Sequence, residues 1–595
     1  MAKDMQSPIR TRLRGNGVRT LLLALVLIAP LSLAVAATQP QDVTVPAGTT
    51  LTVAAPLSVG TLTVLGTLKM DAPGDLRIVA QSIHVGPHGV IAGFAGAPGR
   101  DAHGLGATGA PGLDGGSVYL TAQSVEVDEG GFILAGAGGH GGNAEGLGLV
   151  TAGPGGQGGS VVVQAVTSRL DGALVPGDGG DGGNAAEVVH DLVLQGATVA
   201  GNGGDAGWAL LNGRPVAPSA APPPIVAEVI DLVFYCGVPL PLTPVGAPGA
   251  PGVVTRGGRG GDACMRSFSA DGLPCVGDAG DGETPHPTHA SATAGNGGAG
   301  GPTQPGGAGG TAVAWARSGN GSDGCPGATT GGAAGNGAGA TADAQGGRGG
   351  QGGHSVGLTA GGSGGGGGSA FSEAYGGIAG NGGSITTAIG TGGAAGIGGG
   401  ASATAVAGDG GSGGDNNSGI GGGGGSANAT AIAGHGGNGG NAGPGLTGGT
   451  AGLGGSGGNP SSSARAGSGG AGSIGGGGGD AKATTGGPGQ SPYGGDAGNI
   501  GTAQPGGSGG SWSAVAIAGD GGDGCSSPTH TPVPGNGGQG VASGPTGGAP
   551  GGNGTPHGQA GSSLQTSSAN GSSGGIDGPT CATGMHAPPP FQDVF

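Results

Sequence analysis

A Gly-Gly-x pattern that recurs through the C-terminal half constrains this chain more than any other feature. It is clearest in residues 346–354 and 434–441. A period of three residues matches a polyproline-II-like helix, whose backbone groups are free to bond neighbouring chains. Glycine (165) and proline (42) together fill 207 of 595 positions, about 35%, which is more than an ordinary globular core tolerates. The chain is therefore expected to be a repeat structure that stacks its backbone, or else a flexible linker.

Short alternating segments separate the glycine tracts. In residues 43–53 and 60–68, Val, Leu and Thr alternate with period two, which predicts strands. Further on, alanine takes every second position, as in 401–407 and 426–433. Strands that restart after each glycine tract predict an all-β fold, a right-handed parallel β-solenoid with polyglycine-II-like turns. A disordered C-terminal part is the alternative left open.

The pattern divides the chain into five regions. The expected regions are a signal peptide (1–36), an N-terminal β-solenoid (37–212), a Pro-rich linker with an inserted apolar segment (213–258), a Gly/Ala-rich repeat solenoid (259–545) and a low-complexity tail (546–595).

The first residues have the order of a secretory signal. Basic residues precede an apolar run from Leu21 to Ala29, and small residues end at Ala36 and Ala37. Cleavage is expected after one of these two alanines. The run is shorter than the roughly 20 residues that a spanning helix needs, so we expect a secreted or cell-surface protein without a membrane span in the mature chain.

The mature chain is acidic. The whole sequence has 17 Lys+Arg and 34 Asp+Glu. Removing residues 1–36 takes away five basic residues and one acidic residue, which leaves 12 against 33 and a net charge of −21. Nucleic acid is therefore not an expected partner.

Six cysteines lie in the mature part, an even number in an oxidising compartment. They are candidates for disulfide bonds with no pairing assigned: Cys236, Cys264, Cys275, Cys325, Cys525 and Cys581. No two of them have Cys-x-x-Cys spacing, so zinc is not expected.

Aspartate recurs in the glycine turns, which makes calcium the cofactor to test. The residues are Asp178, Asp181, Asp205, Asp262, Asp278, Asp281, Asp409, Asp415, Asp520 and Asp523. No tandem calcium-binding nonapeptide occurs, and Asp also favours turns through local backbone bonds. Turn structure is thus favoured over calcium, and no cofactor is expected.

Catalytic motifs are absent from the sequence. The close histidine pairs, His84/His88 and His286/His289, lack the helical context of a zinc site. Asp75, Arg77, Arg100, Asp101, His103 and Asp114 would have to cluster across coils to form a polysaccharide-cleaving site. We expect no catalytic or metal residues, with a β-helix enzyme acting on extracellular polysaccharide as one alternative.

Ice binding is a second alternative, because Thr-x-Thr strands can present flat arrays. Thr61 and Thr63 give one such pair, but the later coils do not repeat it at the sequence level.

Only 14 residues are aromatic. Trp208, Trp315, Phe371 and Trp512 lie in or beside Ala-lined strands and are the candidate contact residues. Filling gaps in a small-residue core is their competing role.

The predicted function is that of a secreted structural or adhesive protein whose extended surface contacts extracellular or matrix components or other copies of itself.

The Gly-Gly-x-Gly-Gly tracts of residues 259–545 resemble the glycine-rich repeat regions of mycobacterial PGRS surface proteins. The strands near 43–70 resemble the first coils of secreted parallel β-helix proteins, including G8-like modules. Both resemblances imply an extracellular β-solenoid without assigned chemistry.

Overall fold

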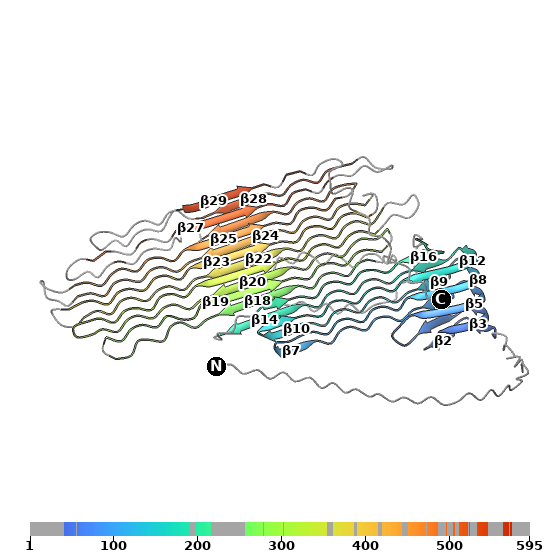
Figure 1. Cartoon of the computed structure of the whole chain (residues 1–595), viewed down its shortest axis with the longest axis horizontal. Coiled ribbons are helices and arrows are strands. Elements are labelled where there is room, and N and C mark those ends of the chain that lie inside the picture. Colours follow the sequence, from blue (N-terminus) through green and yellow to red (C-terminus); the bar gives the residue numbers. More distant parts are fainter. Residues whose placement is uncertain are drawn as a thin grey trace, which may run out of the picture. The chain divides into compact units, whose positions relative to one another are not determined.

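The computed structural model describes most of the chain after residue 40 as strands and the tracts between them (Figure 1). The described residues are 41–54, 56–190, 197–215, 256–277, 279–301, 303–353, 361–385, 390–414, 419–442, 450–471, 473–485, 496, 504–505, 508, 511–521, 523, 532–544, 563–570 and 572–573. They contain no helix. The expected signal peptide and nearly all of the expected linker lie outside them.

One pair of sheets is built mainly from the N-terminal part. The seven-stranded sheet has the order β1 (Val43–Val45), β3 (Leu57–Val64), β5 (Leu76–Val85), β8 (Val118–Val127), β12 (Val161–Leu170), β16 (Ala209–Leu211) and β17 (Arg214–Pro215). The five-stranded sheet has the order β13 (Ala173–Val175), β9 (Phe132–Leu134), β6 (Val90–Ala92), β4 (Thr67–Met70) and β2 (Thr50–Val53). Among the described strands, only β16 and β17 pair antiparallel.

Large aliphatic side chains fill the core between these sheets. Strand β4 alternates half-buried Thr67 and Lys69 with buried Leu68 and Met70, as expected for a strand with one face in the core. Leu62, Ile83, Val125 and Ile133 belong to the same buried cluster. This part of the fold is held by conventional hydrophobic burial.

A second pair of sheets continues along the chain. The nine-stranded sheet has the order β28 (Gly540–Ser543), β26 (Ala481–Thr485), β24 (Ala427–Ile432), β22 (Ala370–Tyr375), β20 (Ala312–Arg317), β18 (Ala263–Phe268), β14 (Ala185–His190), β10 (Ala144–Leu147) and β7 (Ala102–Leu105). The eight-stranded sheet has the order β11 (Leu149–Thr151), β15 (Ala197–Val199), β19 (Thr288–Thr293), β21 (Ala340–Gln345), β23 (Ala401–Val406), β25 (Pro460–Arg465), β27 (Trp512–Ile517) and β29 (Ser563–Ala569).

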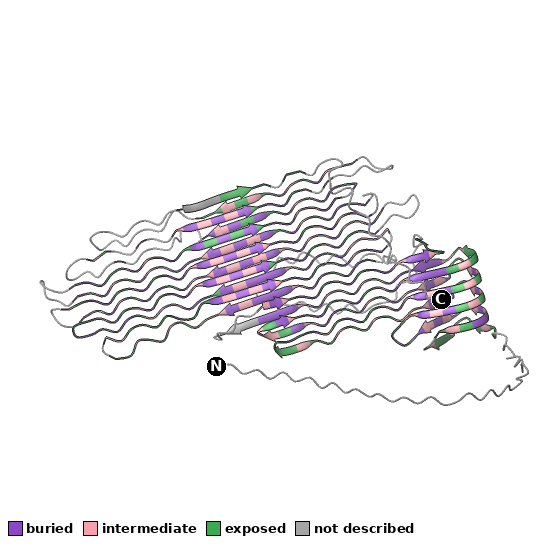
Figure 2. Ribbon diagram, in the orientation of Figure 1, coloured by how far each residue is buried: buried purple, intermediate pink, exposed green. Residues whose placement is uncertain are grey.

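From β18 onward, successive strands alternate between these two sheets, so each turn of the chain adds one strand to each. All the pairs are parallel, and their inner faces are alanine. In β23, Ala401, Ala403 and Ala405 are buried whereas Ser402 and Thr404 are half-buried, and Figure 2 shows the same alternation up the stack. The expected all-β parallel solenoid-like fold is confirmed.

Strands from before residue 212 also belong to the alanine sheets. The chain passes from β6 in the five-stranded sheet to β7 in the nine-stranded sheet, and from β11 in the eight-stranded sheet to β12 in the seven-stranded sheet. Glycine tracts such as 93–101 and 152–160 connect these strands. The expected regions 37–212 and 259–545 therefore contribute strands to the same two sheets.

The glycine tracts bond to one another through their backbones. The Gly349 amide donates to the Asp409 carbonyl (2.9 Å), and the Gly350 amide donates to the Gly307 carbonyl (2.7 Å). The tracts also approach too closely for a side chain, because a Cβ added at Gly350 would lie 1.9 Å from the Gly298 carbonyl oxygen. The paired glycines are thus a packing requirement.

Candidate functional site

Polar side chains in the third position of the glycine triplets form ladders from coil to coil. Asn381 Oδ1 accepts a hydrogen bond from the Asn438 amide (2.9 Å), and Asn438 Oδ1 accepts one from the Asp496 amide (2.8 Å). Each bond gives a partner to a main-chain amide in the next coil. Because an amide without a partner is costly, these bonds explain why Asp, Asn and Ser recur in that position.

The ladders account for most of the aspartates that the calcium hypothesis rests on. Seven of the ten accept an amide of the next coil: Asp178, Asp181, Asp205, Asp262, Asp281, Asp409 and Asp520. Asp278 and Asp415 lie outside the described residues. Among the residues described, no group of three or more His, Cys, Asp or Glu side chains could hold a metal ion. These carboxylates act as hydrogen-bond acceptors between coils.

Two of the histidines singled out in the sequence contact carboxylates on neighbouring strands. His84 Nε2 lies 2.9 Å from Asp128 Oδ2, and His289 Nε2 lies 3.3 Å from Asp343 Oδ2. The hydrogen bond with His289 lowers the pKa of Asp343. Each of these two histidines is therefore paired with a carboxylate.

A charged cluster lies on the outer side of the seven-stranded sheet. Arg169 forms ion pairs with Glu126 (2.6 Å), Asp128 (3.2 Å) and Asp171 (2.8 Å). Because His84 also contacts Asp128, one cation and one histidine engage three carboxylates. The sequence analysis missed this cluster, because His84, Asp128 and Arg169 lie more than 40 positions apart in sequence.

The residues proposed for a polysaccharide-cleaving site have separate partners. Asp75 pairs with Arg77 (3.7 Å), and His103 pairs with Glu145 (3.6 Å). Asp101 and Asp114 accept amides of the next coil. Within the described chain, Asp75 and Arg77 are the only members of this set that pair with each other, and no contact joins the set into one acid/base site.

The outer side of the nine-stranded sheet has an aromatic cluster. The Trp315 ring lies 4.7 Å from Phe268 and 5.6 Å from Tyr375, and the Arg266 guanidinium lies 5.9 Å from the Trp315 ring centre. Phe371 is also half-buried on this side and packs with Val313 and Cys264. Trp315 and Phe371 were predicted contact residues, whereas Phe268 and Tyr375 join them only through strand register.

The other two predicted contact residues lie elsewhere. Trp208 is half-buried just before β16. Trp512 is 5% exposed within the alanine core, and its Nε1 has no hydrogen-bond partner. Trp512 therefore fills the core, which is the competing role considered for it.

Short polar side chains cover the outer side of the eight-stranded sheet. We call the first two outward residues of each of β21, β23 and β25 the hydroxyl face: Thr341, Asp343, Ser402, Thr404, Ser461 and Ser463. The third outward residues, Gln345, Val406 and Arg465, form a row that borders this face. Strand register places Thr341, Ser402 and Ser461 in one row and Asp343, Thr404 and Ser463 in a second. The described residues thus include a two-row array that the sequence analysis did not find.

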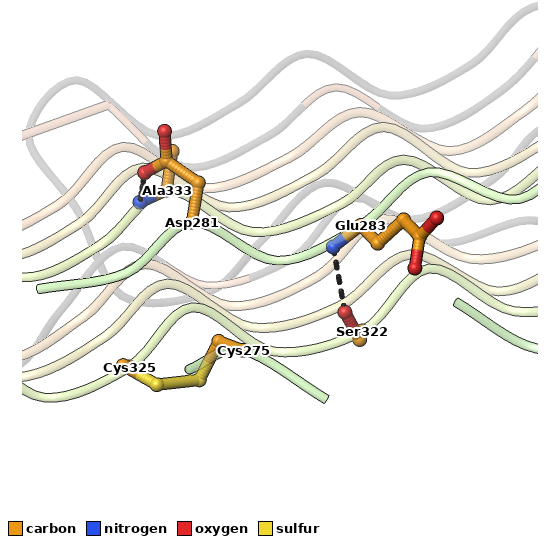
Figure 3. Close-up of a disulfide and its surroundings, with 6 residues drawn as sticks. All are labelled: Cys275, Asp281, Glu283, Ser322, Cys325 and Ala333. Atoms are coloured by element: carbon orange, nitrogen blue, oxygen red, sulfur yellow. Dashed lines mark hydrogen bonds between the residues drawn. A yellow bond between two sulfur atoms is a disulfide. The ribbon is translucent and has the colours of Figure 1, made fainter. Parts of the chain in front are cut away.

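Two consecutive coils are joined by a disulfide between Cys275 and Cys325 (Figure 3), with an S–S distance of 2.02 Å. Beside it, the Ala333 amide donates to Asp281 Oδ1 (2.8 Å) and the Glu283 amide donates to Ser322 Oγ (2.7 Å). Cys264 is also disulfide-bonded. Cys236, Cys525 and Cys581 lie outside the described residues.

One carboxylate is buried in the alanine core. Glu187 on β14 is 1% exposed, its Oε1 accepts the Gly148 amide, and its Oε2 has no partner. Burial raises the pKa of Glu187 from about 4.5 to about 7. Strand register places it beside Gly146 and Met265. The sequence analysis did not single it out.

Comparison with protein-family models finds no match to this chain, and comparisons with curated proteins and with solved structures find none either. In the described part of the chain, no helix is long and apolar enough to cross a membrane. The outer faces of the sheets and the ladders between coils carry the polar and aromatic clusters described above.

Proposed function

We propose that the chain is a secreted structural or adhesive protein of the cell surface that acts through extended repeat faces and without catalysis. In this proposal the solenoid is right-handed, the glycine tracts are polyglycine-II-like helices, and residues 1–36 are removed on export. The partners are extracellular or matrix components, or further copies of the chain.

The observation that carries this proposal is the coil-to-coil bonding of the glycine tracts. Backbone bonds such as Gly350 to Gly307 and side-chain bonds such as Asn381 to Asn438 repeat from turn to turn. Contacts that are individually weak become effective when a rigid surface presents many of them together. A lattice of this kind supports a surface role better than an enclosed reaction site.

Adhesion and catalysis can be separated in one experiment. Beads coated with purified residues 37–595 are washed over insoluble extracellular matrix and polysaccharide, and both bead retention and soluble sugar are measured. The proposal predicts retention above beads coated with an unrelated acidic protein, and no release of sugar. Retention equal to that control would contradict the adhesive role, and sugar release would support the polysaccharide-cleaving enzyme.

The expected export is tested on the full chain. Expression in a secreting bacterium should yield a product whose N-terminus is Ala37 or Thr38, outside the cytoplasm. A product that stays in the cytoplasm with Met1 intact would contradict the localisation.

A further inference from the structure

The hydroxyl face has a regular geometry in two directions. Register pairs Thr341 with Ser402 and Ser402 with Ser461, and it pairs Asp343 with Thr404 and Thr404 with Ser463. Adjacent strands lie about 4.8 Å apart, and residues two apart along a strand are separated by about 6.6 Å. The six side chains therefore form a two-dimensional grid of hydrogen-bonding groups.

Buried residues hold the strands beneath the grid in place. The residues between its members along the strands, Ala342, Ala403 and Ser462, are almost fully buried, and the two alanines belong to one alanine cluster. Alanine has no side-chain rotamers, and neighbouring strands are joined along their full length. The positions of the outward groups are thus fixed by the backbone.

The edge of the grid before β21 and β23 has glycines that packing does not require. Gly339 and Gly400 directly precede β21 and β23, and an added Cβ would meet no atom closer than 3.7 Å and 3.4 Å respectively. These contacts are ordinary van der Waals distances, unlike those of the paired glycines within the tracts. Glycine at these two positions is not required by packing and leaves this edge of the grid without side chains, whereas Gln345, Val406 and Arg465 border the other edge.

The chemistry of the face restricts its ligand. None of the six side chains is aromatic, and the one carboxylate, Asp343, is engaged by His289 and by the Thr404 hydroxyl. Exchanging water for a dissolved ligand gains little per hydrogen bond, and a sugar polymer normally adds aromatic stacking that this face cannot supply. A flat lattice of water molecules, by contrast, offers donors and acceptors at many grid points together.

We propose that the hydroxyl face binds the surface of ice. The hydroxyls of Ser402, Ser461 and Ser463 would take lattice positions of ordered water, and the methyl groups of Thr341 and Thr404 would lie between them. This activity does not rest on the adhesive role, because the two are measured by different assays.

The chain offers a matched pair of variants. Thr404 on β23 and Thr430 on β24 occupy the same place in the sequences Ala-Ser-Ala-Thr-Ala and Ala-Asn-Ala-Thr-Ala, but they lie on different sheets. Thr404→Tyr places a bulky ring in the grid, and Thr430→Tyr places the same ring on the nine-stranded sheet. Both sites face outward, and tyrosine is well tolerated in strands.

The test measures uptake of residues 37–595 into slowly growing ice, together with the gap between melting and freezing temperatures. We expect the native chain and Thr430→Tyr to enter ice and to widen the gap, and Thr404→Tyr to lose both effects. Ser463→Tyr, at an exposed position, should behave as Thr404→Tyr does and decides the case if the Thr404 variant does not fold.

Three results would overturn the inference. The native chain could be excluded from ice as an ordinary solute is. The Thr404→Tyr and Ser463→Tyr variants could enter ice as well as the native chain does, which would place the activity elsewhere. Retention on a neutral polysaccharide that Thr404→Tyr abolishes, without any uptake into ice, would assign this face to a different partner.

Discussion

At each Gly-Gly-x triplet, the two glycines and the third residue have different physical tasks. The glycines allow carbonyl oxygens of adjacent tracts to approach, as Gly298 does toward Gly350. The third residue points outward, and its side chain can bond an amide of the next coil, as Asn381 does. Glycine at an outward position, as at Gly366, is not required by packing, because a Cβ there would meet only the Gly423 oxygen at 3.8 Å.

This difference between glycines gives the first prediction. Gly350→Ala should lower the free energy of unfolding by about 1–3 kcal/mol or more, the usual cost of overpacking, because its Cβ would overlap the Gly298 carbonyl. Gly366→Ala should be neutral or stabilising by up to about 1 kcal/mol through the unfolded state. Urea unfolding of the two variants measures the difference, and equal losses would contradict the packing account.

A second prediction concerns the ladders. Asn381→Ala removes the acceptor of the Asn438 amide, so hydrogen exchange at Asn438 should become faster, and the unfolding free energy should fall by about 0.5–1.5 kcal/mol. Ile378→Ala is the matched control, because Ile378 occupies an equivalent position without an acceptor. Unchanged exchange at Asn438 in the Asn381 variant would show that the ladder does not protect the amide.

The sequence indicated that Asp and Asn recur in the glycine turns, but it did not indicate their hydrogen-bond partners. Asp and Asn in glycine turns were assigned to local bonds, whereas the structure uses them between residues such as Asp323 and Asn381, which are 58 positions apart. One available signal was overlooked: Trp512 has the same strand parity as Ala514 and Ala516, which predicts burial, whereas Trp315 has the opposite parity to Ala314 and Ala316. The burial of both tryptophans in the structure follows this parity.

At the scale of the strand, alanine alternation sets which face is buried. The inward residues of β21 and β23 are nearly all covered, and the outward residues are not. Strand β14 departs from this rule, because Glu187 takes an inward position between the sheets. A carboxylate there is tolerated most readily in its neutral form.

The third prediction is therefore a pH dependence. Glu187 has a folded pKa of about 7, raised from about 4.5 by burial, so the unfolded chain loses this proton first. The contribution of Glu187 to stability should be greatest below about pH 4.5 and should fall as pH rises toward 7. Glu187→Gln should remove this fall, as measured by thermal unfolding between pH 4 and pH 8.

Glu145→Gln on the adjacent strand is the control, because Glu145 is exposed and paired with His103. Burial also raises the pKa of Asp178, to about 6, so the stability contributed by Asp178 also falls as pH rises. The Glu187→Gln variant would keep this second fall. A pH profile that is identical in the native chain and the Glu187 variant would contradict the account.

Period-two alternation predicted strands in segments such as 43–53 and 401–407, but it could not predict which sheet each strand joins. Residues 144–147 and 263–268 are far apart in sequence, yet both lie in the nine-stranded sheet through β14. Turn lengths between strands vary, so no fixed repeat length gives the register. The hydroxyl face escaped notice for this reason, because Thr341, Ser402 and Ser461 align only after the tracts between them are folded.

At the scale of the whole molecule, two kinds of core share one chain. Residues such as Leu62 and Ile133 form an aliphatic core, and alanine fills the other, with glycine tracts passing between the two pairs of sheets (Figure 1). A core of alanine buries little apolar area per residue. Its stability must therefore depend on the hydrogen-bonded tracts on either side, which makes their order the central claim.

Segment-resolved hydrogen exchange on purified residues 37–595 tests that claim most directly. The account predicts that amides in the tracts 361–369 and 419–426 are protected to a degree comparable with strands β22 and β24, because Gly365, Gly368 and Gly425 donate to neighbouring carbonyls. Free exchange throughout these tracts, with protection confined to 43–211, would contradict the lattice and leave an N-terminal solenoid that carries an unstructured coat.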